Sequence, residues 1–174
     1  EPLVRERVAG AVSLFTRARE LEFPLPDEVH PAFMREVADV HRELFAQNAD
    51  LYGDNVRTKI ERCLAVTDGE YETARRARDE YREQCEEIMA GLDLVLTPTV
   101  GFVAPPLPAD DLEHRQAMIR FTFPFNALGW PALALPCGPA EEGLPASIQI
   151  IGRDDALVLA AGQLLEASLQ RGTP

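Results

Sequence analysis

Side chains that could act as nucleophiles are few in this sequence. Its serines are Ser13, Ser147 and Ser168, and none stands in a Gly-x-Ser-x-Gly turn that would expose its hydroxyl. A serine nucleophile also needs a base and a glycine-rich loop whose N–H groups bind the oxyanion. Lys59 is the sole lysine, and the residues around it, Val56–Ile60, do not form such a site. We therefore expect structural roles for the serines and no catalytic residue in this chain.

Metal-binding and thiol chemistry are not indicated either. His30, His41 and His114 stand apart, without a partner at metal-ligand spacing, so we expect neither metal nor cofactor. Cys137 could be a reactive thiol or a small buried residue, and its place between a proline and a glycine favours the buried residue. Adjacent carboxylates do not face each other on a helix, which favours caps and turns. These pairs are Asp110-Asp111, Glu141-Glu142 and Asp154-Asp155.

The bend around residues 120–130 is the best candidate for a binding site. Arg120, Phe123 and Trp130 gather there with Phe121, and aromatic side chains at a strand entrance can line a pocket for an apolar acyl or amide group. Packing in the core is the competing interpretation. Asn126 is expected to tie a helix end to a loop through its amide.

The elements before this bend are predicted to be mainly helical, forming an arm over residues 1–91. Apolar residues at helical spacing predict helices that begin near Val4, at Pro31, near Val56 and after Thr67. Thr67-Asp-Gly-Glu70 has the spacing of a capping box. On the second helix the predicted buried face holds Phe33, Val37, Val40 and Leu44.

Short apolar segments predict strands at four places. Leu21–Leu25 is interrupted by prolines, which predicts a short edge strand. Leu92–Thr97 is nearly all apolar, which predicts a central strand buried on both faces. Pro131–Pro136 and Ala146–Ile151 predict two more strands, joined by a turn at Glu141–Gly143.

Two helices complete the predicted unit of residues 92–174. The first begins at Asp110 or Asp111, and the second is capped by Asp154 or Asp155. The fold class expected is α/β: a mixed sheet with flanking helices, preceded by the helical arm, in a single segment of residues 1–174. The inward face of the last helix is predicted to hold Leu157, Val158, Ala161, Leu164, Leu165 and Leu169.

Composition narrows the class of protein. The 174 residues hold 17 basic and 29 acidic side chains, a formal charge of −12 that disfavours nucleic acid as a partner. No apolar run reaches the roughly 18 residues that a membrane span needs, so no membrane partner is expected. Three widely spaced cysteines indicate a reducing compartment, which predicts a cytoplasmic location. The first residue is Glu1 and not Met, which suggests a processed or excised piece.

The order of motifs resembles the C-terminal portion of the amidase signature family. The motifs are Leu92-Asp-Leu-Val-Leu-Thr-Pro-Thr99, Ala104-Pro-Pro106, Phe121–Pro139, Gly143–Arg153 and the closing helix Asp155–Leu169, with a weak match at Tyr52–Val56. The resemblance implies a fragment of an α/β/α fold. It also implies hydrolysis of a small-molecule carboxylic amide through a Ser, cis-Ser, Lys triad located outside this chain. In that family the bend at Arg120, Phe123 and Trp130 helps to wall the substrate cleft.

Two other functions remain open at this point. One is the A subunit of a glutamyl-tRNA amidotransferase. In that branch an Asp binds the α-amino group of the substrate, but Ile119 or Arg120 stands at the aligned position here. A buried ammonium needs a negative partner, which favours a general amidase. The other is a non-catalytic interaction module in which the charged helix Thr67–Ala90 binds a partner.

Self-association is the last expectation. Strands that are apolar on both faces need cover on both, and an excised piece would leave an unpaired edge that can recruit other chains. We therefore expect a homo-oligomer.

Overall fold

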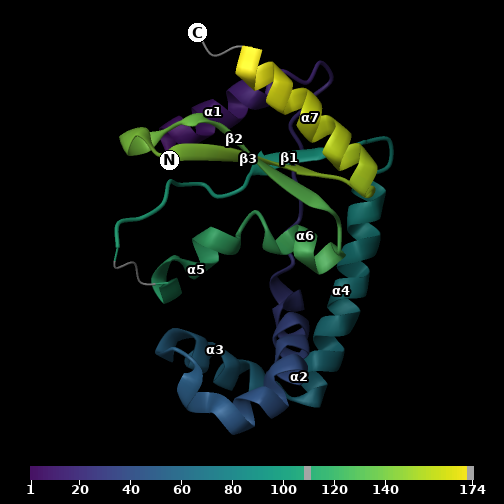
Figure 1. Cartoon of the computed structure of the whole chain (residues 1–174). Coiled ribbons are helices and arrows are strands. Elements are labelled where there is room, and N and C mark those ends of the chain that lie inside the picture. Colours follow the sequence, from purple (N-terminus) through teal and green to yellow (C-terminus); the bar gives the residue numbers. More distant parts are fainter. Residues whose placement is uncertain (108–110, 172–174) are drawn as a thin grey trace. The chain divides into compact units, whose positions relative to one another are not determined.

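The computed structural model describes residues 1–107 and 111–171. Contacts divide the chain into two compact units. Pro24–Glu87 form a helical unit, and the residues before and after it together form a unit built on a β-sheet. Figure 1 labels the helices and strands of both. The boundary thus differs from the one expected at residue 91, because the first helix of the chain belongs with the sheet.

The helical unit consists of α2 (His30–Asn48), α3 (Asp54–Leu64) and all but the end of α4 (Asp68–Ile88). The three helices confirm the prediction made from the spacing of apolar residues in the sequence. The buried side chains of α3 and α4 recur at helical spacing: Ile60, Cys63, Ala74, Tyr81 and Cys85. The hydroxyl of Tyr81 donates to the carbonyl of Pro24 at 3.1 Å, which joins α4 to the segment before α2.

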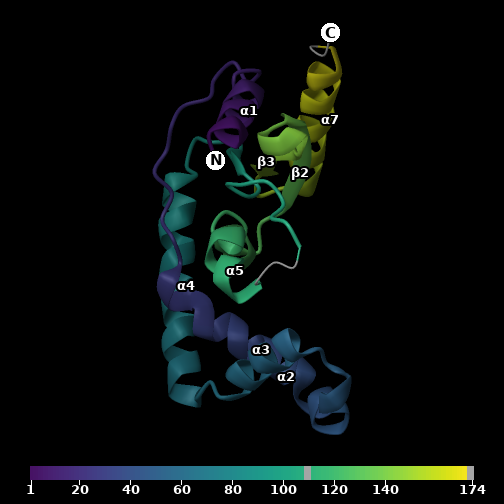
Figure 2. The same cartoon turned by 90° about the vertical axis from the view of Figure 1, so that its left-hand side faces the viewer.

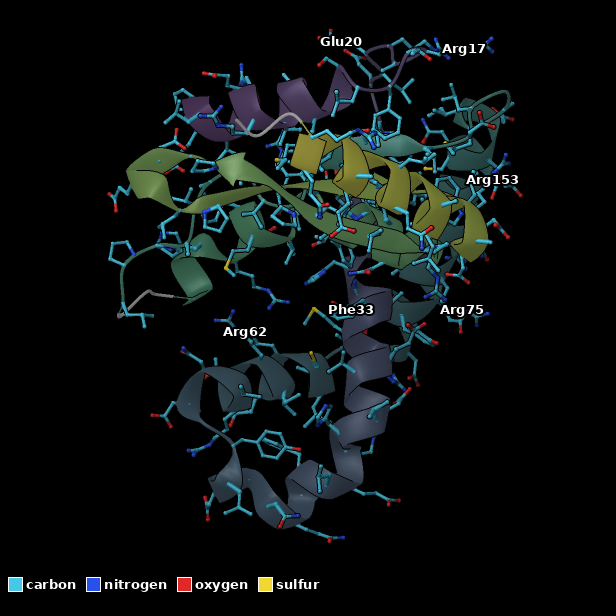
Figure 3. All side chains as sticks on the ribbon, turned by 45° about the horizontal axis from the view of Figure 1, so that its top comes forward. Arg17, Glu20, Phe33, Arg62, Arg75 and Arg153 are labelled. Carbon is cyan, nitrogen blue, oxygen red and sulfur yellow. The ribbon has the colours of Figure 1, made fainter. Side chains whose placement is uncertain are left out.

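The buried face predicted for α2 is wrong. Val40 is 78% exposed and Leu44 is 54% exposed, and Phe33, labelled in Figure 3, is also exposed. The helix buries Ala32 and Ala38 on its other side, where short side chains allow close packing. Arg35 also lies there, with its side chain 22% exposed, and donates to Asp68 of α4 at 2.7 Å. Periodicity located an apolar stripe correctly but could not tell which face the neighbouring helices cover.

The start of α4 is the predicted capping box. The hydroxyl of Thr67 accepts from the backbone N–H of Glu70 at 3.3 Å. In return the Glu70 carboxylate accepts from the N–H of Thr67 at 2.9 Å and from its hydroxyl at 2.7 Å. These bonds, the side-chain bond first, hold the pKa of Glu70 below its ordinary value.

The sheet has three antiparallel strands in the order β1–β3–β2. They are β1 (Val95–Pro98), β2 (Ala132–Pro139) and β3 (Pro145–Ile151). The α/β class is confirmed, although both described pairings are antiparallel where a mixed sheet was expected. The strand expected to be central, β1, lies at one edge, and β3 lies in the middle, so that its Ile148 and Ile150 are fully buried.

Two helices cover the same face of this sheet. In Figure 1 both α1 (Pro2–Val12) and α7 (Asp155–Arg171) lie above the strands. Their buried residues, among them Val8 and Leu165, form one cluster with Ile148 and Ile150. The backbone of α7 comes so close that a Cβ on Gly162 would stand 2.2 Å from Leu133 Cδ2. Glycine at this position therefore permits the close contact between helix and sheet.

Polar contacts fasten α1 to the hairpin of β2 and β3. The carboxylate of Glu141 in the hairpin turn accepts from the N–H of Leu3 at 2.7 Å, which satisfies a free donor in the first turn of the helix. Arg7 Nε donates to the carbonyl of Pro139 at 2.7 Å. These bonds span more than 130 residues of sequence, so sequence patterns alone could not assign α1 to the sheet unit.

Two predictions about the ends of this unit need correction. Leu21–Leu25 does not form a strand, because no described segment pairs with it. On α7 the Asp154 carboxylate caps the helix as predicted, accepting from the N–H of Leu157 at 2.9 Å. Leu157 and Leu164 nevertheless face solvent, at 40% and 72% exposed, because the sheet covers a face narrower than the apolar stripe.

The opposite side of the sheet carries two short helices. In Figure 1 α5 (Asp111–Ile119) and α6 (Phe123–Leu128) lie below the strands, and Figure 2 shows α5 below the sheet from the side. α5 falls within the predicted helix. The proposed cap at Asp110 lies outside the described residues.

The capping box gives a stability prediction. Thr67→Ala should lower the free energy of unfolding by about 1 kcal/mol, because the backbone N–H of Glu70 loses its acceptor. Glu70→Gln should cost less, since an amide oxygen can accept the same bonds. Urea denaturation of both variants makes the comparison, and equal losses would contradict a role for the Thr67 hydroxyl.

The same carboxylate makes stability depend on pH. The pKa of Glu70 is lower in the folded chain than its ordinary value of 4.5, so its contribution is complete above that value. It is lost as the pH falls through the lowered folded pKa. Urea midpoints between about pH 5 and pH 2.5 should therefore fall less steeply for Glu70→Gln than for the natural chain. Parallel curves would show that the carboxylate does not contribute.

Candidate functional site

The bend between α5 and β2 is built around a helix end with a glycine. Gly129 has φ of 70°, the left-handed conformation that ends α6. The N–H of Gly129 donates to Asn126 O at 3.2 Å and that of Trp130 donates to Phe125 O at 3.1 Å, the paired bonds of a Schellman motif. Trp130 is thereby held at the entrance of β2. The side chain of Asn126 is exposed, so the end of α6 is fixed by its backbone.

A buried amide holds the other end of the bend. Gln149 lies on β3, is 5% exposed and is the buried polar residue of the described core. Its Nε2 donates to the carbonyl of Phe121 at 2.8 Å and to Thr97 Oγ1 at 3.2 Å. One side chain therefore joins the middle strand, the edge strand β1 and the loop that carries Arg120 and Phe121.

The three predicted binding residues lie at different places on this bend. Arg120 is exposed just after α5, and its guanidinium carbon stands 5.9 Å from the centre of the Phe121 ring. Phe123 is half-buried and begins α6. Trp130 is half-buried and meets the ring of Phe23 edge-on, with centroids 6.3 Å apart.

Packing accounts for part of this aromatic group. Phe23 also lies 5.2 Å from the ring of Phe125, which is 3% exposed. Trp130 therefore has one side against a small aromatic core made by Phe23 and Phe125. Part of its surface remains exposed. The role of all three in binding stays a prediction.

Each of the three serines makes hydrogen bonds within its own helix or to the neighbouring strand. The hydroxyl of Ser13 donates to Gly10 O at 2.7 Å, and that of Ser168 donates to Leu164 O at 2.8 Å. Ser147 lies half-buried on β3, where its carbonyl accepts from the N–H of Thr99 at 3.0 Å. Lys59 is half-buried on α3 in the helical unit. Bonds of this kind anchor a hydroxyl to its own helix and do not activate it as a nucleophile.

Burial and contacts describe the surroundings of Cys137 and His41. Cys137 is 8% exposed in the bulge of β2, and burial raises the pKa of its thiol, so it is the small buried residue that the sequence favoured. In the helical unit His41 Nδ1 lies 3.0 Å from the Tyr52 hydroxyl, a structural contact. Among the residues that the structure describes, no three His, Cys, Asp or Glu side chains gather at a possible metal site.

Sequence reasoning missed Gln149 and Phe23 as parts of this site. A signal for Gln149 was present, because a polar residue inside the apolar run Ala146–Ile151 must find hydrogen-bond partners if the strand is buried. No comparable signal marks Phe23, since its contact with Trp130 depends on the path of the chain after α1.

A double-mutant cycle tests the role of Gln149. Gln149→Met should lower the free energy of unfolding by about 1–3 kcal/mol, because it leaves the Phe121 carbonyl and the Thr97 hydroxyl without their donor. Combined with Thr97→Val, the losses should be non-additive by at least about 0.5 kcal/mol.

Urea unfolding followed by fluorescence of Trp130, the single tryptophan, reports the bend directly. The matched control Gln163→Met, on the exposed face of α7, should stay within about 0.5 kcal/mol; additive losses would contradict the shared bond.

Comparison with known proteins gives the family. The Amidase family profile matches residues 8–159. The putative amidase AmiD of Mycobacterium tuberculosis is 30% identical over 138 residues, which cover 75% of this chain and 29% of that protein. The fatty acid amide hydrolase of Medicago truncatula is 31% identical over 121 residues, 64% of this chain and 20% of that protein. The chain thus spans less than a third of the length of these relatives.

Solved structures agree on the fold. A crystal structure of an amidase superposes with a TM-score of 0.82 at 31% identity, over 95% of this chain and 42% of that one. The likeness includes the sheet and the bend, since it covers nearly the whole chain. In the residues that the structure describes, no helix is both long and apolar enough to cross a membrane. From the profile, the relatives and the shared fold together, the chain belongs to the amidase signature family.

Proposed function

We propose that this chain is the C-terminal part of an amidase signature hydrolase that cleaves a carboxylic amide. The Ser, cis-Ser, Lys triad would lie in residues outside the chain. Membership of the family carries this proposal, together with the share of the relatives that the chain covers. The engaged hydroxyls of Ser13 and Ser168 support it, because neither is oriented by a base.

The reaction proposed is acyl transfer in two steps. The activated serine oxygen attacks the amide carbon, and the C–N bond breaks as the leaving nitrogen takes a proton, which forms an acyl-enzyme ester. Water then attacks the ester carbon, and the serine leaves with a proton while the carboxylic acid is released. The residues of this chain would contribute to binding and positioning of the substrate.

The bend from Arg120 to Trp130 is the proposed contribution to the substrate wall. Phe123 and Trp130 offer apolar surface suited to an acyl or amide substituent, and the exposed Arg120 offers a charge at the rim. Gln149 acts as a positioning residue in this proposal, since it holds the Phe121 carbonyl and so fixes the loop before α6. A wall of this kind needs rigidity, because loosely held side chains discriminate poorly between substrates.

The first test measures hydrolysis by the chain alone. Purified residues 1–174 should give no steady turnover of simple aromatic or aliphatic amides, because a triad and an oxyanion loop are both needed for useful rates. The complete reading frame, assayed in parallel, should hydrolyse at least one amide of the panel. Turnover by the chain alone that titrates with a serine-directed inhibitor and is lost in Ser13→Ala, Ser147→Ala or Ser168→Ala would contradict the assignment.

The second test asks whether Trp130 contacts substrate. In the complete enzyme Trp130→Ala should change the ratio of kcat/KM between a bulky and a small amide by about 1–3 kcal/mol, the scale expected for a reshaped apolar pocket. Phe33→Ala, an exposed aromatic of α2, serves as the control and should leave the ratio unchanged. An equal loss for all amides, with a lowered melting temperature, would assign Trp130 to the core instead.

A further inference from the structure

The chain passes between its two compact units at two places. One is the peptide bond between Phe23 and Pro24, and the other is that between Glu87 and Ile88. At the first of these, each neighbouring residue is held by contacts inside its own unit. The ring of Phe23 packs in the sheet unit, and the carbonyl of Pro24 is bonded in the helical unit. This peptide bond therefore joins two anchored residues.

In the sheet unit, Phe23 is the ring against which Trp130 packs. The ring centroids of Phe23 and Trp130 stand 6.3 Å apart, and Phe23 also lies 5.2 Å from Phe125. Phe125 is 3% exposed, and its carbonyl accepts from the N–H of Trp130. The backbone thus fixes Phe125 and Trp130 to each other, whereas Phe23 comes from a segment without helix or strand. The position of Phe23 therefore depends on support from elsewhere in the chain.

In the helical unit, Tyr81 supplies this support through Pro24. Tyr81 is 6% exposed on α4, and its hydroxyl donates to the carbonyl of Pro24 at 3.1 Å. Burial raises the pKa of Tyr81 above its ordinary value of 10.0, so the hydroxyl keeps the proton that it donates. Cys85, one turn further along α4, is fully buried, which holds this face of the helix in the core of its unit. Pro24 is thereby bonded to a well-packed helix.

The connection between Phe23 and Pro24 is stiff. The peptide bond is planar, and the ring of a proline fixes its own φ near about −65°. A residue before proline is also confined to extended conformations, which limits ψ of Phe23. A hydrogen bond that fixes the Pro24 carbonyl therefore restricts where the backbone of Phe23 can lie, and with it the ring that meets Trp130.

We propose that Tyr81 is a positioning residue for the substrate wall: its hydroxyl fixes Pro24, and Pro24 in turn holds Phe23 against Trp130. The inference rests on the proposed role of Trp130 in that wall. Tyr81 itself is buried in the helical unit and acts without touching the substrate. Loss of its hydroxyl should loosen the support on one side of Trp130 without removing any ring. The helical unit would then contribute to substrate selection, although the bend belongs to the sheet unit.

Quenching of Trp130 fluorescence tests the link in residues 1–174, where Trp130 is the single tryptophan. Tyr81→Phe should raise the acrylamide quenching constant by about twofold or more, because loss of one hydrogen bond shifts a local equilibrium by about twofold to tenfold. Phe23→Leu, which removes the ring but keeps an apolar side chain, should raise the constant at least as much.

The matched control is Tyr52→Phe, which removes the hydroxyl that lies 3.0 Å from His41 Nδ1 in the same helical unit. Its quenching constant should equal that of the natural chain, because residue 52 has no bond to the segment at Pro24. An unchanged constant in Tyr81→Phe, or an equal rise in Tyr81→Phe and Tyr52→Phe, would overturn the inference.

Substrate selection tests the consequence in the complete enzyme. Tyr81→Phe should change the ratio of kcat/KM between a bulky and a small amide by about twofold to tenfold. In a Trp130→Ala background the same substitution should leave the ratio unchanged, because its effect passes through Trp130. A purely structural role would instead lower kcat/KM equally for all amides, whether or not Trp130 is present, and would overturn the inference.

The two measurements separate this inference from the proposed function. A ratio that changes in Trp130→Ala but not in Tyr81→Phe would overturn the inference and leave the substrate wall in place. A ratio that is unchanged in Trp130→Ala would contradict the wall itself, and the role of Tyr81 in substrate selection with it, even where quenching confirms that Tyr81 holds Trp130.

Discussion

The middle strand β3 is buried on both faces, and the sheet unit depends on this burial. Ile148 and Ile150 face α1 and α7, while Gln149 and Ile151 face the other side. A polar side chain in such a strand is costly unless its donors are satisfied. The bonds from Gln149 to Thr97 and to the Phe121 carbonyl meet this requirement and at the same time fix the bend. The Gln149 side chain thus stabilises the core and also positions the proposed substrate wall.

Long-range contacts then decide how the rest of the unit is arranged. Glu141 and Arg7 attach α1 to the hairpin, and Gly162 brings α7 against Leu133. The outer edge of β1 borders an apolar groove that α1 also lines.

Sequence patterns predicted where helices and strands lie better than they predicted which segments pack against them. Local chemistry determines a capping box at Thr67 and a cap at Asp154, and the structure confirms the helices that they begin. The exposed stripe of α2 and the edge position of β1 depend on which segments pack beside them, and periodicity carries no such information. The bend at Trp130 was found from its residue types, but its support by Gln149 and Phe23 depends on contacts distant in sequence.

The central claim is that this chain supplies binding surface to an amidase whose nucleophile lies outside it. Labelling the complete protein with a serine-directed covalent probe, followed by peptide mapping, tests that claim most directly. The account predicts one labelled serine, located outside residues 1–174, and loss of amide hydrolysis in proportion to labelling. Stoichiometric label on Ser13, Ser147 or Ser168, with parallel loss of hydrolysis, would contradict it.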